Sequence, residues 1–323
     1  MMDFCGAVDV GGTKIASALF TRDGESLVKE KVPLDKAGGD AAAAQVGERI
    51  AVLSEAARAA GGRILAVGIC VPGIAYSVTG RVWAPNIPDW DQYPLLDKIR
   101  GFAPKAVVPL VLESDRSAYV AGEAWRGAAA GSRDAVFLAV GTGIGAGIIS
   151  GGRILHGHED IAGAVGWFGL DPDFKPEYAA MGSFEAEASG NSVARKARKR
   201  LAGRRGSAML DLAGGDVAAV TAEIVAEAAR RKDPLALEVV SGVVTYLAMG
   251  VANIVSLLNP EVVVVGGGLF QAADVFLEPV RREFKRWAQP LAARSVRIEL
   301  TTLGEDAGLY GCGRSAWNAL DGE

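Results

Sequence analysis

The chain has few cysteines, histidines and aromatic residues. Its 323 residues include three cysteines, two histidines and 7% aromatic side chains. Cys5, Cys70 and Cys312 are odd in number and far apart, which excludes the disulfide framework of a small secreted protein and favours a reducing compartment. Because half of the residues are hydrophobic and aromatics are scarce, the core must be built from Ala, Val, Leu and Ile, as in α/β proteins.

The chain also has no large excess of one charge and no long unbroken hydrophobic run. A formal net charge of -4 gives no reason to expect a nucleic-acid partner. The first ten residues, MMDFCGAVDV, do not resemble a signal peptide. The most apolar stretch, residues 254–270, is interrupted by Asn259-Pro260-Glu261 and predicts a helix end, a turn and a strand. We therefore expect a cytoplasmic protein with no membrane partner.

The two halves of the chain repeat one pattern of predicted elements. Each half begins with three strands whose first turn is rich in glycine, and then adds helices and buried strands. In the first half these are strands at 4–10, 14–20 and 26–32, a helix at 41–61, and strands at 64–71 and 106–115. In the second half they are strands at 135–140, 147–152 and 153–157, helices within 221–260, strands at 261–270 and 296–304, and a helix at 308–320. The repetition predicts a duplicated pair of α/β domains with mixed sheets.

One segment is strongly basic and allows two interpretations. It runs ARKARKRLAGRRG and contains Arg195, Lys196, Arg198, Lys199, Arg200, Arg204 and Arg205. The segment could be an anion or nucleic-acid patch, or the solvated face of a helix. The acidic balance of the whole chain favours the solvated helix face.

Three glycine-rich turns are candidates for phosphate binding. A glycine turn can present backbone N–H groups to an anion and lets a phosphate approach closely. The first turn, Gly11-Gly12-Thr13-Lys14, adds a hydroxyl and a cation, and Asp9 precedes it where a carboxylate could hold Mg²⁺ through water. The others are Gly141-Thr142-Gly143 and Gly266-Gly267-Gly268, the second of which ends a buried strand. Each turn by itself could be a tight hairpin or a bulge, but together they suggest a nucleotide held in a cleft between two lobes.

Two other nucleotide-binding motifs are excluded. The P-loop pattern GxxxxGK[ST] is absent from the chain. The run GTGIGA, from Gly141 to Ala146, fits the dinucleotide fingerprint, but that fingerprint must open a helix. The residues that follow it predict two strands, so we reject a Rossmann domain.

Taken in order, the motifs of the chain resemble the ROK sugar kinases, a family of the actin-like ATPase superfamily that includes hexokinase. The resemblance covers nearly the whole chain and rests on DVGGTKI, CVPGI, APNIPDW, LESDRSAYVAGEAWRGAAAG, GTGIGAGI, AGAVGW, FEAEASG, EVVVVGGGLF and LGEDAGLYGCG. It implies two ribonuclease-H-like domains flanking a cleft, a smaller lobe of residues 1–115 and 305–323 and a larger lobe of residues 116–304. It also implies ATP and Mg²⁺ as cofactors and a homodimer.

The resemblance assigns roles to the turns and to one carboxylate. The first two glycine turns would bind the ATP phosphates, Gly266–Gly268 would border the adenosine, and Asp115 would be the base for the sugar 6-hydroxyl. Phosphoryl transfer needs an in-line alcohol, a proton acceptor and charge neutralisation. Asp115 can be the proton acceptor, and Lys14, Mg²⁺ and the amides of the glycine turns can neutralise charge. Local sequence also allows Asp115 to be no more than the N-cap of the helix that follows it.

The chain departs from the family at the sugar end. Ser114 stands where the family has Asn, and Ala164-Val165-Gly166-Trp167 stands where it has Glu-x-Gly-His. The family's zinc cysteines would lie around Tyr178–Ser183, where this chain has none, so we expect no zinc. His156 and His158 could be read as a metal pair, but no cysteine or third histidine completes a site.

The sugar contacts that the resemblance leaves are Gly73, Asn86, Ser114, Asp115 and Glu185, while Trp167 either stacks on the sugar or fills a hole in the core. Glucose or a glucose-like hexose is the expected substrate, and an amino hexose is a rival because Glu159 and Asp160 could pair with an ammonium group. The phosphoryl donor could also be polyphosphate. A ROK repressor would need an N-terminal helix-turn-helix, for which a first strand at Phe4 leaves no room. An inactive sugar or nucleotide sensor stays as the alternative to a kinase.

Overall fold

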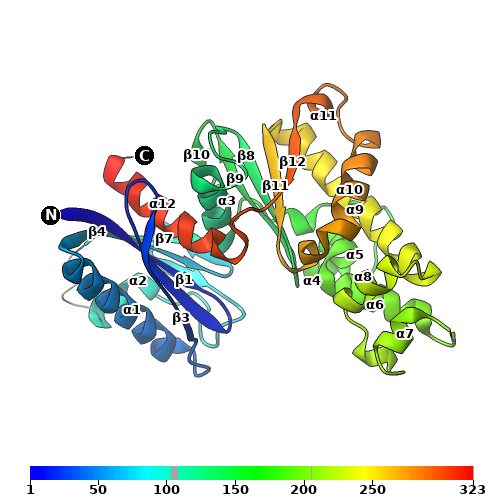
Figure 1. The fold of residues 1–323 in the computed structure, drawn as a ribbon, viewed down its shortest axis with the longest axis horizontal. Helices are drawn as coiled ribbons and strands as arrows, with labels where there is room; N and C mark the ends of the chain where they lie inside the picture. Colours follow the sequence, from blue (N-terminus) through cyan, green and yellow to red (C-terminus); the bar gives the residue numbers. More distant parts are fainter. Residues whose placement is uncertain (103–107, 205, 323) are drawn as a thin grey trace. The chain divides into compact units, whose positions relative to one another are not determined.

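The structure, a computed structural model, describes residues 1–102, 108–204 and 206–322 (Figure 1). The chain packs into two compact units. One unit consists of residues 1–133, 147–162 and 302–323, and the other of residues 134–146 and 163–301. The lobe boundaries expected from the sequence, 1–115 with 305–323 and 116–304, stay a prediction.

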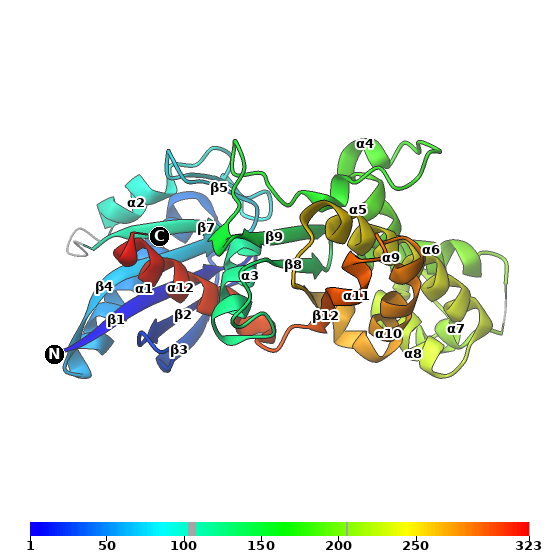
Figure 2. The same ribbon diagram turned by 90° about the horizontal axis from the view of Figure 1, so that it is seen from above.

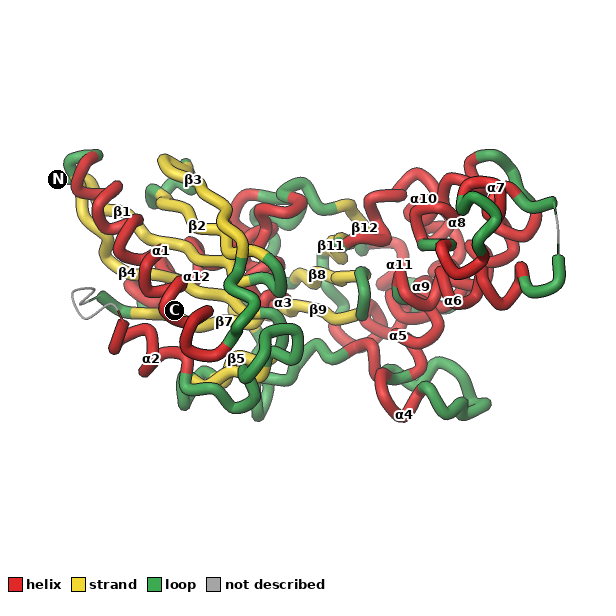
Figure 3. Tube along the Cα trace, turned by 90° about the horizontal axis from the view of Figure 1, so that it is seen from below, coloured by secondary structure: helices red, strands yellow, loops and turns green. Residues whose placement is uncertain are grey.

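The first unit is built on a five-stranded mixed sheet with the order β3-β2-β1-β4-β7 (Figure 3). Strands β1, β2 and β3 pair antiparallel, whereas β1, β4 and β7 run parallel. Residues 106 and 107 of the strand expected at 106–115 lie outside the described residues. The elements of this part are β1 (Met2–Val10), β2 (Lys14–Phe20), β3 (Ser26–Pro33), α1 (Gly39–Ala59), β4 (Gly62–Val71), β5 (Ile74–Tyr76), β6 (Arg81–Trp83), α2 (Leu95–Phe102), β7 (Leu110–Ser114), α3 (Asp115–Arg126) and α12 (Ala307–Asp321).

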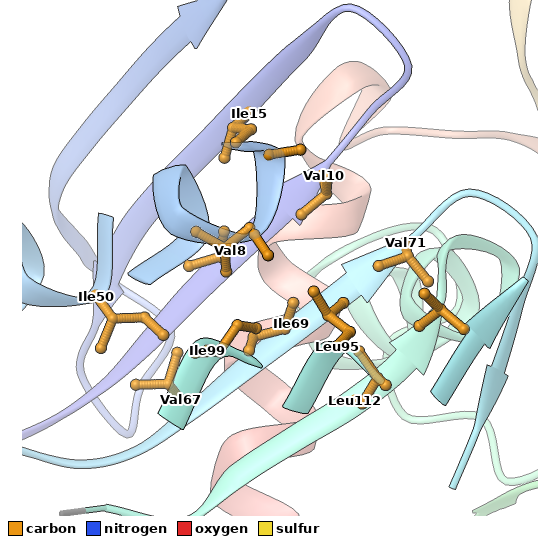
Figure 4. Close-up of a cluster of buried hydrophobic side chains, with 14 of the residues drawn as sticks. Val8, Val10, Ile15, Ile50, Val67, Ile69, Val71, Leu95, Ile99 and Leu112 are labelled. Carbon is orange, nitrogen blue, oxygen red and sulfur yellow. The ribbon is translucent and has the colours of Figure 1, made fainter. Parts of the chain in front are cut away.

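One face of this sheet carries large aliphatic side chains and is covered by α1 and α2. Figure 4 shows this core, in which Val8, Ile69 and Leu112 of three parallel strands meet Ile50 of α1 and Leu95 of α2. All five are buried. Alternating strand residues point to the same face, so these side chains fix which face of each strand lies inward. Burying each such side chain contributes about 1.5–3 kcal/mol.

The opposite face carries mostly small residues, with Phe20 as the large exception, and is covered by α3 and α12, which lie side by side (Figure 2). Glycines bring the backbones into contact there. A Cβ on Gly68 of β4 would lie 1.9 Å from the carbonyl oxygen of Cys312, and one on Gly311 would lie 1.8 Å from that of Ala118. The C-terminal helix therefore packs directly on the N-terminal sheet, at a distance that only glycine permits.

The second sheet has the order β10-β9-β8-β11-β12, which repeats the arrangement of the first sheet. Strand β11 runs parallel to both β8 and β12, and β10 pairs antiparallel with β9. The predicted mixed α/β fold with two mixed sheets is confirmed. The remaining strands and α-helices are β8 (Ala135–Val140), β9 (Ile144–Ser150), β10 (Arg153–Ile154), α4 (Tyr178–Met181), α5 (Ser183–Ala188), α6 (Gly190–Leu201), α7 (Ala208–Leu212), α8 (Ala222–Arg230), α9 (Pro234–Leu258), β11 (Val262–Gly266), α10 (Ala273–Glu283), α11 (Ala292–Ser295) and β12 (Arg297–Leu300). Short 3₁₀ helices lie at Val165–Trp167, Val217–Ala219, Gly268–Ala272, Phe284–Arg286 and Gly304–Asp306.

Judged by its length and composition alone, helix α9 could cross a membrane. It begins at the N-cap Asp233, whose carboxylate accepts the backbone N–H of Ala236 at 2.9 Å, and it ends at Asn259 in a left-handed conformation. It contacts α5, α6, α8 and α10, and Val243, Leu247 and other side chains along it are buried. Within the second unit it is a core helix.

The close approach of α12 and α3 predicts a large cost for a single methyl group. Gly311→Ala should lower the free energy of unfolding by about 3 kcal/mol, because the new Cβ overlaps the Ala118 carbonyl and the two helices must separate. Gly242→Ala is the matched control, since no atom lies within 4 Å of a Cβ there, and it should raise stability by about 0.5–1 kcal/mol. Urea unfolding of both variants tests this, and equal effects would contradict it.

Candidate functional site

The carboxyl ends of the parallel strands gather the polar residues of the first unit. Asp9 lies at the end of β1, Gly73 follows β4, and Asp115 follows β7. Parallel strands end at the same sheet edge, so these residues come together although they are far apart in the chain. The N-cap of α3 is Ser114, whose side chain accepts the backbone N–H of Ser117 at 3.2 Å. The interpretation of Asp115 as the N-cap is therefore wrong.

Asp115 has the environment of a proton acceptor. Its Oδ1 accepts the backbone N–H of Arg116 at 2.8 Å, it hydrogen-bonds the backbone of Gly73, and a quarter of its side chain is exposed. Burial, together with the nearby charge of Asp9, raises its pKa to about 6, although Arg116 acts in the opposite direction. At neutral pH this carboxylate is ionised, with a pKa close enough to neutrality to accept a proton efficiently.

The first glycine turn closes the hairpin between β1 and β2. The backbone N–H of Gly11 donates to the carbonyl of Lys14 at 2.8 Å. A Cβ on Gly12 would lie 3.4 Å from the Cβ of Asn86, so the proposed phosphate turn and the proposed sugar contact Asn86 are neighbours. Asn86 itself is exposed.

Lys14 has a partner that sequence reasoning missed. Its Nζ lies 2.8 Å from Glu305, which also pairs with Lys31 at 3.1 Å. Hydrogen bonds from these two lysines hold the pKa of Glu305 well below its usual range. The run LGEDAG that carries Glu305 was part of the family resemblance, but no local signal indicated a contact between residues 291 positions apart.

In the second unit, two of the glycine turns line one pocket of about 330 Å³. Gly190 donates its backbone N–H to the carbonyl of Gly141 at 2.8 Å, which places the start of α6 against the turn. Gly267 has a φ of 92°, and a Cβ there would lie 2.6 Å from the carbonyl oxygen of Val140, so the position requires glycine. The pocket is lined by Gly141, Thr142, Gly190, Asn191, Ala194, Arg198, Thr221, Ala222, Glu223, Gly268 and Leu269. An adjoining cavity of about 210 Å³ shares Ala222, Glu223, Gly268 and Leu269.

Several of these lining residues were missed from the sequence. Asn191, Ala194 and Arg198 are spaced i, i+3 and i+7, so they share one face of α6. That spacing was visible in the sequence but was not connected to the turn at Gly141. The Nε of Arg198 also donates to the carbonyl of Val220 at 3.0 Å.

Glu185 is held by the second glycine turn. Its Oε2 accepts the backbone N–H of Ile144 at 2.7 Å, and burial raises its pKa. The neighbouring segment carries Trp167, whose side chain is 57% exposed. The interpretation that Trp167 fills a hole in the core is wrong, and stacking on a sugar stays a prediction.

A charged cluster occupies the segment where the resemblance would place zinc cysteines. Glu187 of α5 accepts hydrogen bonds from Lys175 at 2.6 Å, from Tyr178 at 2.5 Å and from Lys196 at 2.6 Å. Asp171 accepts hydrogen bonds from Lys175, Tyr178 and Tyr246. Burial raises the pKa of Glu187, but the hydrogen bonds from the two lysines outweigh burial and lower it overall. The Glu187 cluster consists of Asp171, Lys175, Tyr178, Glu187, Lys196 and Tyr246.

The basic segment of α6 lies mostly on an exposed helix face, because Arg195, Arg198, Lys199 and Arg200 are exposed. Lys196 belongs to the Glu187 cluster, Arg195 donates to Glu177 at 3.1 Å, and Arg198 and Arg200 also have partners within the second unit. The interpretation as a solvated helix face therefore holds for these exposed residues, and Lys196, which is only partly exposed, is the exception. Arg205 lies outside the described residues.

His156 has a carboxylate partner in the first unit. Its Nε2 lies 3.0 Å from Glu113, and this hydrogen bond raises the pKa of His156. Asp160 accepts the backbone N–H of Ser77 at 3.0 Å, whereas Glu159 is exposed. Within residues 1–102, 108–204 and 206–322, no three His, Cys, Asp or Glu side chains are grouped so that they could hold a metal ion. The expectation of no zinc stays a prediction.

Comparison with known proteins identifies relatives over the whole chain. Residues 5–317 match the ROK family. A glucokinase of Halalkalibacterium halodurans is 32% identical over 310 residues, which cover 95% of this chain and 92% of that protein.

Solved structures agree with this match. A ROK family glucokinase from Streptomyces griseus, in complex with glucose and AMPPNP, has 30% identity and a TM-score of 0.77, with 98% of this chain and 99% of that chain covered. The ROK hexokinase from Thermus thermophilus has 29% identity and a TM-score of 0.81, with 99% and 100% covered. The predicted fold class is confirmed by these neighbours.

The Glu187 cluster predicts that stability depends on one carboxylate. Glu187→Gln should lower the free energy of unfolding by roughly 2–4 kcal/mol, because Lys175 and Lys196 lose the buried charge that compensates theirs. Glu177→Gln removes the charge of a carboxylate that pairs with Arg195 and is more exposed than Glu187. It should change the free energy of unfolding by less than about 0.5 kcal/mol. Thermal and urea unfolding compare the variants. An effect of Glu187→Gln no larger than that of Glu177→Gln would contradict the role of the cluster.

Proposed function

The chain belongs to the ROK family, and from that premise we propose that it is an ATP-dependent sugar kinase that transfers the γ-phosphate to the 6-hydroxyl of a hexose. The observation that carries the proposal is Asp115, a partly shielded carboxylate with a pKa of about 6 at the carboxyl edge of the first sheet. Relatives that are glucokinases, over nearly the full length of both chains, support the same activity.

Asp115 acts as the general base in this proposal. The transition state of phosphoryl transfer is loose, so the protein has to position the alcohol, accept its proton and stabilise charge on the phosphate. The hydrogen bonds from the backbone of Arg116 and Gly73 hold the carboxylate in one orientation. Its raised pKa suits an acceptor that is ionised at neutral pH and takes the hydroxyl proton as the new bond forms.

The turn at Gly11–Lys14 would receive the transferred phosphate. Backbone N–H groups and Thr13 supply hydrogen-bond donors, and Lys14 supplies a positive charge. Because Lys14 is paired with Glu305 at 2.8 Å, an incoming phosphate competes with that carboxylate for the ammonium group. The pair keeps the lysine near the turn without burying it.

Asp9 fits the role of a magnesium ligand. It is an oxygen donor at the end of β1, beside the phosphate turn, and the described residues contain no group of three or more His, Cys, Asp or Glu side chains that would make a closed metal site. Mg²⁺ prefers a few carboxylate oxygens and takes its other ligands from water and phosphate. When bound, the ion would supply charge neutralisation at the phosphates.

The pocket of the second unit would hold the remainder of the nucleotide. Gly141 and Thr142 offer donors to phosphate, and Gly268, Ala222 and Glu223 form the wall that continues into the adjoining cavity. Glycines at this wall let a flat base approach the backbone closely. The AMPPNP bound to the Streptomyces griseus relative supports ATP as the donor.

Glucose or a glucose-like hexose is the proposed acceptor, with an amino hexose as its rival. Asn86, Glu185, Gly73 and Ser114 would read the ring hydroxyls, and Trp167 would stack on an apolar face of the sugar. An inactive sensor is the alternative function, which the changed residues Ser114 and Trp167 allow. The presence of Asp9 and Asp115 argues against a sensor, because a protein without catalytic activity would not need these two carboxylates.

Asp115→Asn should lower kcat by about three orders of magnitude while ADP affinity stays unchanged, because an amide keeps the shape but cannot accept the proton. For the wild-type protein, kcat should fall as the pH decreases below about 6, where Asp115 becomes protonated. Asp97→Asn, at an exposed carboxylate of α2, is the control and should behave as wild type. Coupled ADP-release assays across pH test this. A kcat near wild type for Asp115→Asn would remove Asp115 as the base.

The substrate is tested by kcat/KM for glucose, mannose, fructose, their amino derivatives and N-acetylglucosamine. We expect glucose or glucosamine to rank highest and N-acetylglucosamine lowest, because the family's Glu and His at the positions of Ala164 and Trp167 are absent. A preference for N-acetylglucosamine would contradict this interpretation. If an amino hexose is preferred, Glu159→Gln and Asp160→Asn should reduce that preference, and unchanged selectivity would exclude these carboxylates as its cause.

A further inference from the structure

Cys70 lies between two carboxylates on the first sheet. The parallel register pairs Asp9 of β1 with Cys70 of β4, and Cys70 with Glu113 of β7. Residues that are paired across neighbouring strands project from the same face of a sheet. Asp9, Cys70 and Glu113 therefore form a polar row across the carboxyl ends of three strands, on the face that α12 covers.

The thiol of Cys70 contacts the carboxylate of Asp9 directly. Its Sγ donates to Oδ1 of Asp9 at 3.2 Å. Cys70 is completely buried, so water does not compete for this contact.

The other oxygen of Asp9 lies close to the backbone of α12. A Cβ on Gly308, in the first turn of that helix, would lie 2.4 Å from Oδ2. The carboxylate is thus held between a thiol on one side and helix backbone on the other. Cys70 and Gly308 therefore contact its two oxygens from different elements.

A thiol is a suitable donor at this position for a chemical reason. An arginine or lysine would neutralise Asp9 and compete with a cation for it, whereas a thiol donates weakly and carries no charge. A thiol donor therefore adds no positive charge next to Asp9. The orientation is set by a neighbour that does not compete for the ligand.

We propose that Cys70 is a positioning residue for Asp9: its thiol fixes the carboxylate in the orientation in which Asp9 serves the magnesium–nucleotide complex. The inference rests on the proposed function, since it assigns Cys70 to the same site. Cys312 of α12 provides the contrast: it is equally buried and contacts Cys70, but its own thiol donates to the carbonyl of Val8 at 3.5 Å.

The test compares Cys70→Val, Cys70→Ala, Cys70→Ser and Cys312→Ala by calorimetric titration with ADP, with and without Mg²⁺, and by kcat and sugar KM. The Val and Ala variants remove the donor, and should weaken binding of ADP with Mg²⁺ and lower kcat, each about tenfold, the effect of one hydrogen bond to a charged group. Their affinity for ADP without Mg²⁺ and their sugar KM should stay within about twofold of wild type. Cys70→Ser keeps a donor and should restore both quantities, and Cys312→Ala should leave all of them near wild type.

Three results would overturn the proposal. One is an equal loss in Cys70→Ala and Cys312→Ala, which would make Cys70 a packing residue. Another is a loss of ADP affinity in the Cys70 variants that is the same with and without Mg²⁺. The third is a Cys70→Ser variant that behaves as Cys70→Val does. Cys70→Val fills the space that Cys70→Ala leaves empty, so it keeps the test available if Cys70→Ala does not fold.

The ADP titrations distinguish a failure of this inference from a failure of the proposed function. If wild type binds ADP with a Mg²⁺ dependence that the Cys70 variants lose, but phosphorylates no hexose, Cys70 positions Asp9 and the kinase activity is wrong. If wild type phosphorylates a hexose and the Cys70 variants match it in every measurement, the kinase activity stands and the role of Cys70 is wrong.

Discussion

Parallel pairing of β1, β4 and β7 is the constraint on which the chemistry of the first unit depends. It brings the ends of three strands to one edge and so joins Asp9, Gly73 and Asp115, which the chain separates by many residues. The register is held by aliphatic side chains on the face that α1 and α2 cover. Because strand side chains alternate, a slip of one residue would turn Asp9 to that apolar face and move its carboxylate away from the site.

The two faces of this sheet have different packing, and the difference serves the site. Large aliphatic residues keep α1 at side-chain distance, whereas Gly68, Gly122 and Gly311 let α12, α3 and β4 come into backbone contact. This close contact places Gly308, at the start of the C-terminal helix, against the carboxylate of Asp9 near the N-terminus. A residue near the end of the chain thus helps to shape a site whose motif lies at its beginning.

In the second unit, backbone contacts and ion pairs position the residues of the candidate site. Its glycine turns meet at one pocket, and α6 begins against the first of them. Helix α5 is tied at both ends: Ser183 accepts the backbone N–H of Leu170 at 2.8 Å, and Glu187 binds two lysines and a tyrosine. Between these anchors Glu185 holds the backbone of Ile144. Charged hydrogen bonds therefore cross-link the segment in which the family resemblance would place cysteines, and they fix the side chain proposed to read the sugar.

Local patterns in the sequence determined the strands, the glycine turns, the repeated order of elements and the position of Asp115 after a buried strand. Those features depend on residues close together in the chain, through side-chain alternation, turn chemistry and capping. Even there, the local pattern could not tell whether Ser114 or Asp115 caps α3, because both residue types suit the position. Only the tertiary structure decided that Lys14 pairs with Glu305, that Cys70 donates to Asp9, that Lys196 joins a buried cluster and that Trp167 is exposed. The raised pKa of Asp115 belongs to the same group, because it comes from burial and from a charge on another strand. Such properties follow from strand register and helix packing, which bring together residues that carry no signal of one another in the sequence.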